Sequence, residues 1–340
     1  MEAGQALNAV RQIRIPDRAP LATRWPLNVD AVLLDDCSGT DDQLDKLYEK
    51  AKQQQWNASD YDWSYELKHD NPLDMPDQTL LVYGTTLWNE MPDPERADVR
   101  RHFQAWTLSQ ILHGEQAAML CAVKLAQAEE SHAARMCACA QAFDEARHIE
   151  VYSRLVKDKV AISYPLSSAL RGLLENTVTS RELDITNLGM QILVEGLALA
   201  IFQNIVAYSR DPFIKTLVSK IQRDEARHFA VGRITLKRLY NGGLEQHEMR
   251  IREDFLKESI HVLYEHLCAD DVWETLGHNR KAGERTVRES RIANVLRRAM
   301  FQRLVPSIRD LGLLSASVSK QLEQLGMLDY ASLPIREGNV

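Results

Sequence analysis

Long runs of apolar residues at helical spacing dominate this chain, and no stretch alternates as a strand does. In a helix, residues three and four positions apart share one face, so such runs predict helices that bury one side. The pattern predicts four long helices, over residues 94–128, 131–159, 181–208 and 212–241. Asp211-Pro212 is a typical start for the fourth helix, and Gly242-Gly243 is a typical stop.

Shorter segments flank the four long helices. Thr40 is expected to cap a helix from Asp41 to about Gln55, and residues 1–40 are expected to form an extended arm. Further helices are expected near residues 77–90, 165–177, 244–276 and 286–303. We therefore predict an all-α fold, a four-helix bundle at 95–242 with an N-terminal part at 1–94 and a C-terminal part at 243–340. The three parts are expected to form one compact domain.

Composition and net charge limit the classes of protein to which this chain can belong. The chain has 340 residues, 45% hydrophobic and 26% charged, as in an ordinary soluble protein. The net charge of −7 gives no reason to expect nucleic-acid binding. No secretory signal is expected at the N-terminus, and the most apolar stretch, about 192–207, contains Glu195 and is predicted to be too short and too polar for a membrane span. Five cysteines without a framework predict reduced thiols and a cytoplasmic protein.

One pentapeptide, Asp-Glu-Ala-Arg-His, occurs at 144–148 and again at 224–228. An apolar helical stretch with one glutamate precedes each copy. Glu115 stands as far before Glu145 in the sequence as Glu195 stands before Glu225. The chain therefore repeats one pattern, a glutamate followed at the same distance by Glu-x-x-His.

This spacing predicts a site for two metal ions. Glu and His three residues apart point from the same helix face, and the separation from the earlier glutamate allows a helical hairpin that brings it alongside. A glutamate from each of two helices and a Glu-x-x-His from each of the other two are the ligands of ferritin-like di-iron and di-manganese bundles. Two divalent cations would also offset the mutual repulsion of four buried carboxylates. The predicted ligands are Glu115, Glu145, His148, Glu195, Glu225 and His228.

The residues next to these ligands have an expected role. A metal-bound histidine usually donates its other ring N–H to a carboxylate. Asp224 is expected to hold His148, and Asp144 to hold His228, across the two hairpins. Arg147 and Arg227 are expected to pair with these aspartates.

The chain resembles the oxygen-activating branch of the ferritin-like di-iron carboxylate superfamily. Glu115, Glu195 and the two Asp-Glu-x-Arg-His motifs carry the resemblance, which covers roughly residues 95–242. The branch includes multicomponent monooxygenase hydroxylases, acyl-carrier-protein desaturases, ribonucleotide reductase small subunits, the benzoyl-CoA epoxidase type and arylamine N-oxygenases.

Departures from these families narrow the choice. The hydroxylases and the desaturases place a threonine where this chain has Leu199 and Ala198. Arylamine N-oxygenases add a histidine where this chain has Ile221, which predicts that this class fits less well. Tyr152 occupies the place of the radical tyrosine of ribonucleotide reductase, yet the first ligand there is usually an aspartate. Tyr152 is thus either a redox residue or a packing residue.

Side chains one turn from the ligands could leave a dry pocket for O₂ and a substrate, or could simply pack the bundle. The candidate pocket residues are Ala118, Met119, Gln141, Ala142, Gln191, Ala198, Leu199, Phe202 and Ile221. The aromatic segment at 56–75 is expected to cover the bundle.

The resemblance implies a di-iron oxygenase or oxidase that uses O₂ to hydroxylate, epoxidise, desaturate or N-oxygenate a small organic substrate. Two irons are the expected cofactor, with manganese or a mixed pair as alternatives. No other cofactor site is recognisable, so a ferredoxin or reductase is expected to supply electrons, and a homodimer is usual. The alternatives are a radical-generating subunit that uses Tyr152, and a ferroxidase or iron-storage protein. The sequence does not indicate the substrate.

Overall fold

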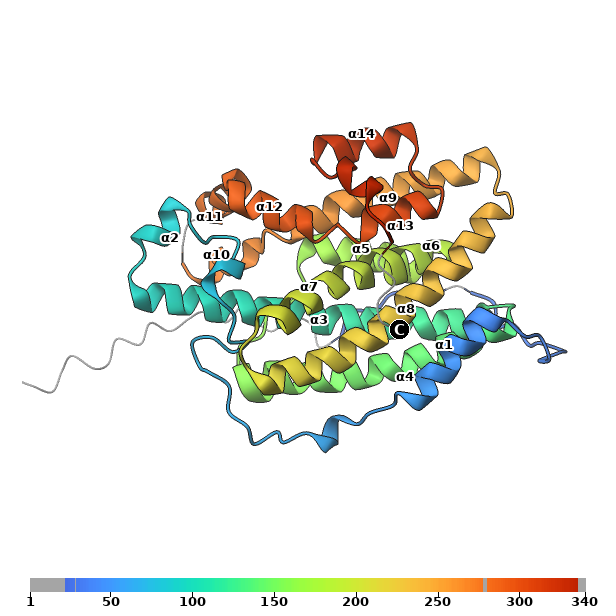
Figure 1. The fold of residues 1–340 in the computed structure, drawn as a ribbon, viewed down its shortest axis with the longest axis horizontal. Helices are drawn as coiled ribbons and strands as arrows, with labels where there is room; N and C mark the ends of the chain where they lie inside the picture. Colours follow the sequence, from blue (N-terminus) through green and yellow to red (C-terminus); the bar gives the residue numbers. More distant parts are fainter. Residues whose placement is uncertain (1–21, 28, 278–279, 336–340) are drawn as a thin grey trace, which may run out of the picture.

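The computed structural model describes residues 22–27, 29–277 and 280–335, and over these ranges its regular secondary structure is helical, without a strand. The all-α fold is therefore confirmed for the described chain. The expectations for the first residues of the N-terminal arm and for the C-terminal tail lie outside these ranges. Figure 1 shows the long helices side by side, with the C-terminal helices stacked across one side of them.

Four long helical segments form the bundle, as predicted. They are α3 (Asp93–Ala128), α4 (His132–Arg154), α7 (Glu195–Tyr208) with the helical turns before it, and α8 (Pro212–Asn241). Helix α3 packs along α4, α7 packs along α8, and α4 also contacts α8. The Ser131 and Asp211 side chains cap α4 and α8 by accepting hydrogen bonds from the first-turn N–H groups. The two hairpins therefore face each other, and their ligand-bearing faces meet.

The third long segment is not a uniform α-helix. It begins as α6 (Leu183–Asn187), continues as the π-helical η4 (Leu188–Val194) and becomes α7 at Glu195. At Gly232 of α8, a Cβ atom would lie only 2.7 Å from the Cβ of Gln191, so a glycine allows α8 to approach this π-helical turn. A second π-helical segment, η3 (Leu155–Val160), extends α4. Such π-turns are frequent at functional sites.

The continuous helical segment Leu183–Tyr208 is long and apolar enough to cross a membrane by length and composition alone. The expectation of a run too short for a membrane span concerned residues 192–207, and the helix that contains this run begins earlier, at Leu183. However, 78% of its most apolar window is buried inside the protein. This burial agrees with the expectation of a core helix that carries a ligand.

Helices outside the bundle cover it on two sides. Helix α1 (Asp42–Gln53) packs on α4 and α8, and α5 (Ser168–Thr179) packs on α3. The C-terminal layer contains α9 (Gln246–His266), α10 (Asp270–Thr275), α11 (Arg280–Glu289), α12 (Arg291–Ala299), α13 (Leu304–Asp310) and α14 (Ala316–Gln324). One buried apolar cluster joins Leu236 of the bundle to Ile308 of this layer. The division at residues 94 and 242 stays a prediction.

Two predicted helices near the N-terminus differ in the structure. Helix α1 is capped by Asp41, whose side chain accepts from the N–H groups of Gln43 and Leu44, and not by Thr40. The expected helix at 77–90 is broken into a 3₁₀ turn, η2 (Asp77–Thr79), and the short α2 (Thr86–Glu90). Gly84 between them has a φ of 73°, which a helix cannot accommodate.

Two predicted C-terminal helices are also divided. The segment at 244–276 breaks after α9, where Ala269 adopts a left-handed conformation with a φ of 52°. The segment at 286–303 is replaced by α11 and α12, because the Ser290 side chain accepts from Ala293 N–H and starts a new helix. The five cysteines form no disulfide, which agrees with the expected thiols.

Candidate metal centre

The six predicted ligands meet in the middle of the bundle. Each bundle helix contributes one or two of these ligands. They are Glu115 on α3, Glu145 and His148 on α4, Glu195 on α7, and Glu225 and His228 on α8. None of the six is more than 5% exposed. The repeated motif therefore does bring its carboxylates and imidazoles together in one buried cluster.

Two groups of four ligand atoms overlap within this cluster. One contains Glu115 and His148 with Glu145 and Glu225; the other contains Glu195 and His228 with the same two glutamates. Within each group, one ligand atom per residue lies within 4.8 Å of the others. Glu145 and Glu225 are therefore placed to be shared between two neighbouring cations, and the other four side chains each face one of them.

The imidazoles point their Nδ1 atoms into the cluster. His148 Nδ1 lies 3.1 Å from a carboxylate oxygen of both Glu145 and Glu225. His228 Nδ1 lies 3.2 Å from Glu145 Oε1 and 4.0 Å from Glu195 Oε2. Each Nδ1 is thus placed to coordinate a metal, which leaves Nε2 for a supporting hydrogen bond.

The predicted aspartate pairs are present. His148 Nε2 donates to Asp224 Oδ2 at 3.4 Å, and His228 Nε2 donates to Asp144 Oδ2 at 3.2 Å. Each aspartate belongs to the opposite hairpin from the histidine that it holds. The crossed pairing fixes the tautomer and orientation of both rings and ties the two hairpins together.

The two arginines complete a buried ion cluster. Arg227 donates to Asp224 Oδ1 at 2.6 Å and to Asp144 Oδ2 at 3.1 Å. Arg147 donates to Asp144 and, at 3.3 Å, to Asp224 Oδ2. Two negative and two positive groups therefore balance one another directly behind the histidines.

Several buried ligand atoms lack a hydrogen-bond partner, although another ligand atom lies within 3.2 Å of two of them. Both carboxylate oxygens of Glu225, one oxygen of Glu195 and Nδ1 of His228 form no hydrogen bond. Buried polar atoms are normally satisfied, and these four all point into the cluster. Hard oxygen donors with one imidazole on each side suit iron or manganese. The residues present thus fit a pair of divalent metal ions.

The electrostatics of the cluster agree with this fit. Burial and the neighbouring Glu225 raise the pKa of Glu115 and of Glu195 well above the usual range. Burial also disfavours the ionised form of Glu145, yet the two histidines hold its pKa well below the usual value. Metal binding to such carboxylates displaces protons and relieves the repulsion that raises their pKa.

Gln141 connects the ligands of the second group, a role that its sequence position did not reveal. Its side-chain amide donates to Glu195 Oε1 at 2.7 Å and to Glu145 Oε1 at 3.1 Å. Gln191, from the π-helical turn, donates in turn to Gln141 Oε1 at 2.5 Å. These two residues were predicted to line a pocket, but they orient metal-binding carboxylates instead.

Trp56 is a second residue whose role the sequence did not show. Its indole Nε1 donates to Asp224 Oδ2 at 2.7 Å, and its ring stacks on His148 at 6.3 Å. The Arg147 guanidinium lies 5.0 Å from the centre of the same ring. The expectation that the aromatic segment merely covers the bundle was therefore wrong for Trp56, which supports the histidine-orienting aspartate from a distant part of the sequence.

Replacing Trp56 by phenylalanine should weaken metal binding. The variant keeps an aromatic ring beside His148 but removes the N–H that holds Asp224. Outer contacts of this kind typically change metal affinity by about 10–100-fold. Competition with a chelator of known affinity measures the effect. Trp63→Phe is the matched control, because its indole donates to the backbone carbonyl of Ala58 and not to the site; equal affinities in both variants would contradict the role of Trp56.

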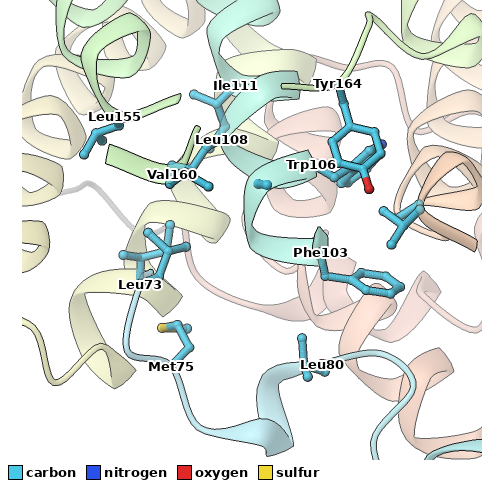
Figure 2. Packing of buried hydrophobic residues seen from close by; sticks show 14 of the residues in the cluster. Leu73, Met75, Leu80, Phe103, Trp106, Leu108, Ile111, Leu155, Val160 and Tyr164 are labelled. Atoms are coloured by element: carbon cyan, nitrogen blue, oxygen red, sulfur yellow. The ribbon is translucent and has the colours of Figure 1, made fainter. Parts of the chain in front are cut away.

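A cavity of about 830 Å³ lies beside the metal-binding side chains. Its wall includes Glu115, Glu195 and Glu225, and otherwise consists mainly of apolar residues from α3, α7, α9, α12 and the segment at 73–81. Figure 2 shows part of this wall, with Phe103 and Trp106 on α3 and with Leu73, Met75 and Leu80 on the segment at 73–81. The site can therefore hold an organic molecule next to the metals.

The predicted pocket residues are mostly misplaced. Ala118 and Ala198 line the cavity, but the other seven do not, namely Met119, Gln141, Ala142, Gln191, Leu199, Phe202 and Ile221. Positions one turn from each ligand were treated as equivalent, but several of them face other side chains of the bundle and not the cavity. The Phe202 ring, for example, stacks on that of Tyr152 at 6.2 Å.

Tyr152 is fully buried, and its hydroxyl forms no hydrogen bond. Burial raises the pKa of this phenol well above its usual value. The ring packs on Phe202, so the structure gives Tyr152 a packing role. A redox role for Tyr152 stays a prediction.

A helical bundle with two overlapping carboxylate and histidine groups beside an apolar cavity defines a ferritin-like di-metal carboxylate protein, and the family match makes it an O₂-activating di-iron oxygenase. The family comparison is more specific. Residues 38–312 match the model of the AurF family, described as p-aminobenzoate N-oxygenase AurF, and the chain belongs to this family. The family uses a di-iron centre, which agrees with the first of the predicted cofactors, a pair of iron ions.

A search of curated proteins finds no match. Among solved structures, the chain is similar to a mutant of an R2-like ligand-binding oxidase with an anaerobically reconstituted Mn/Fe cofactor. That similarity has a TM-score of 0.48 and 18% sequence identity, and it covers 78% of this chain and 92% of the other.

The family assignment corrects one prediction. The isoleucine at position 221 suggested that the arylamine N-oxygenases fit less well, yet the match extends over most of the chain. Ile221 is fully buried in the apolar cluster beside the metal site. The absence of a histidine at position 221 therefore does not exclude the family, because the two groups of four ligands are complete without it.

Proposed function

We propose that this protein uses O₂ to oxidise the nitrogen of a small aromatic amine at a di-iron centre. The proposed ligands are Glu115, Glu145, His148, Glu195, Glu225 and His228. One observation carries the proposal: two ligand groups share Glu145 and Glu225, and three of the ligand carboxylates also line an apolar cavity of about 830 Å³. The family supplies the reaction class.

The roles of the residues follow from their contacts. Glu115 with His148, and Glu195 with His228, would hold one iron each, and Glu145 and Glu225 would hold both. Asp144 and Asp224 orient the histidines, and Gln141 orients Glu195. The apolar cavity excludes water from the substrate. When bound, the irons supply the site where O₂ is reduced and the substrate is oxidised.

Product analysis tests the reaction. Protein loaded anaerobically with two ferrous ions per chain, then mixed with reductant, isotopically labelled O₂ and 4-aminobenzoate, should yield a product that carries labelled oxygen on nitrogen. Mass spectrometry detects the label, and 4-hydroxybenzoate, which lacks the amine, is the matched control. Labelled oxygen on a ring carbon, or equal oxidation of 4-hydroxybenzoate, would show that the reaction is not N-oxygenation.

We also propose an external electron donor, such as a ferredoxin or reductase. In the described part of the chain, the groups of His, Cys, Asp and Glu with metal-binding geometry are the two already assigned, so a further redox metal has no site there. A homodimer and a cytoplasmic location remain proposals from the sequence.

Metal analysis of the purified protein would distinguish a pair of irons from manganese or a mixed pair. Iron uptake far above two ions per chain would favour iron storage.

A further inference from the structure

Two polar side chains, the half-buried His266 and the buried Arg297, lie in the cavity wall away from the metal-binding carboxylates. His266, the last residue of α9, and Arg297 on α12 both line the cavity. The His266 ring lies 4.8 Å from that of Trp106 on α3. Trp106 lies two and a half helical turns before Glu115 on this helix, which corresponds to about 13 Å along the helix axis. The His266 ring is therefore well separated from Glu115 at the metal-binding end of the cavity.

His266 presents a hydrogen-bond donor to the cavity. Its Nδ1 lies 2.9 Å from Ser167 Oγ, which already accepts a hydrogen bond from Leu170 N–H. In the tautomer in which Ser167 donates its hydroxyl hydrogen to Nδ1, the ring hydrogen lies on Nε2. Burial lowers the pKa of His266 to about 4, so the ring is neutral near pH 7. No described residue is hydrogen-bonded to Nε2, so the cavity contents are its available partner.

Arg297 is a buried cation with neutral partners. It is 3% exposed, and its Nε atom forms no hydrogen bond. The guanidinium donates to the carbonyl of Tyr264 at 3.2 Å, to Cys268 Sγ at 2.9 Å and to Asn294 Oδ1 at 2.8 Å.

The nearby acids do not neutralise Arg297. Glu265 and Asp270 both pair with Arg288. Across the described ranges, no carboxylate lies within ion-pair distance of the Arg297 guanidinium. A buried charge without a counter-ion is costly, and an anionic group in the cavity would offset that cost. Arg297 bonds to Tyr264 and Cys268, and His266 lies between these two in the sequence, so both cavity-lining side chains lie at the C-terminal end of α9.

We propose that the cavity binds an elongated substrate: an amine beside the metal-binding carboxylates, an apolar body longer than one aromatic ring, and an anionic group held by His266 and Arg297. This inference rests on the proposed N-oxygenation at the metal centre. One ring with two para substituents is too short to span about 13 Å, because bonds between its atoms are only about 1.5 Å long. The cavity volume of about 830 Å³ is also near the upper end for pockets that take drug-sized molecules.

Binding of three amines tests the length and charge of the substrate. Calorimetry on the iron-loaded protein without O₂ or reductant avoids turnover. We expect 4′-aminobiphenyl-4-carboxylate to bind at least about tenfold tighter than 4-aminobenzoate, since it buries a second ring, and about tenfold tighter than neutral 4-aminobiphenyl, since it reaches the cation. Equal affinity for 4-aminobenzoate or for 4-aminobiphenyl would overturn the proposal.

Two variants test the residues. Arg297→Met and His266→Phe should each reduce the preference for the two-ring acid over 4-aminobiphenyl to less than about threefold, while the affinity for 4-aminobiphenyl stays within about threefold. Arg298→Met is the matched control, because Arg298 follows on the same helix, hydrogen-bonds to Asn294 O and does not line the cavity. His266→Phe keeps a ring beside Trp106 and serves alone if Arg297→Met fails to fold. Retention of the preference in these variants would show that the anionic group binds elsewhere.

The outcomes separate this inference from the proposed function. Tight binding of the two-ring acid without any oxygenated nitrogen would preserve the binding site and reject N-oxygenation. Oxygenation of 4-aminobenzoate without a preference for the longer acid would preserve the function and reject the elongated substrate.

Discussion

Alanine at position 145 should remove at least one of the two iron ions and abolish oxygenation. Glu145 belongs to both ligand groups, so its carboxylate cannot be lost from one metal position without affecting the other. Its oxygens also lie 3.1 Å from His148 Nδ1 and 3.2 Å from His228 Nδ1, so the variant leaves both imidazoles facing an unfilled space. Elemental analysis after anaerobic loading measures the iron per chain.

The control for this experiment lies on the same helix. Glu150→Ala removes an exposed carboxylate that pairs with Arg154 at 3.7 Å, and exposed pairs of this kind contribute little to stability. It should bind two irons and keep its activity. His228→Ala, compared with His261→Ala on α9, repeats the test on the second group. Two irons in both Glu145→Ala and His228→Ala would place the metal site elsewhere.

The ligand set could be predicted because it depends on local geometry. Glu-x-x-His fixes two side chains on one helix face whatever the rest of the fold does, and the equal offset of the preceding glutamate in the two copies implies matching hairpins. The crossed pairing of Asp224 with His148 and Asp144 with His228 followed from the same symmetry, and the hydrogen bonds confirm it.

The cavity could not be predicted in the same way, because segments distant in sequence build its walls. The segment at 73–81, helix α9 and helix α12 meet against α3 and α7 only after the chain has folded. No periodicity connects His266 or Arg297 to the metal-binding motif. The symmetry of the motif was even misleading here, because it suggested a lining from all four bundle helices.

The contact of Trp56 with Asp224 shows a similar limit. The aromatic segment was noticeable in the sequence, but nothing in it indicated which ring would reach the site. The misplaced helix boundaries have local causes instead, such as the left-handed Ala269 and the cap at Ser290. Single-residue caps and turns decide where a helix ends, while apolar periodicity continues across the break.

Replacing Arg227 by methionine should destabilise the protein by about 3–5 kcal/mol, the usual cost of leaving a buried charge without its partner. Arg227 is 2% exposed and donates to both Asp144 and Asp224, so the variant leaves Arg147 as the only arginine paired with the two buried carboxylates. Methionine has a similar length and keeps the packing. Denaturant unfolding in the presence of a chelator measures this loss separately from any loss of metal.

A control variant and a second substitution that restores the charge balance test whether the buried aspartates and arginines are stabilised by their charges. Arg223→Met, one turn earlier on α8, removes only a hydrogen bond to the carbonyl of Gln54 and should cost about 1 kcal/mol or less. Adding Asp144→Asn to Arg227→Met restores the match of one cation to one anion, so the double variant should be more stable than Arg227→Met alone. If the double variant is less stable instead, shape and hydrogen bonding, and not charge balance, determine the stability of the layer behind the histidines.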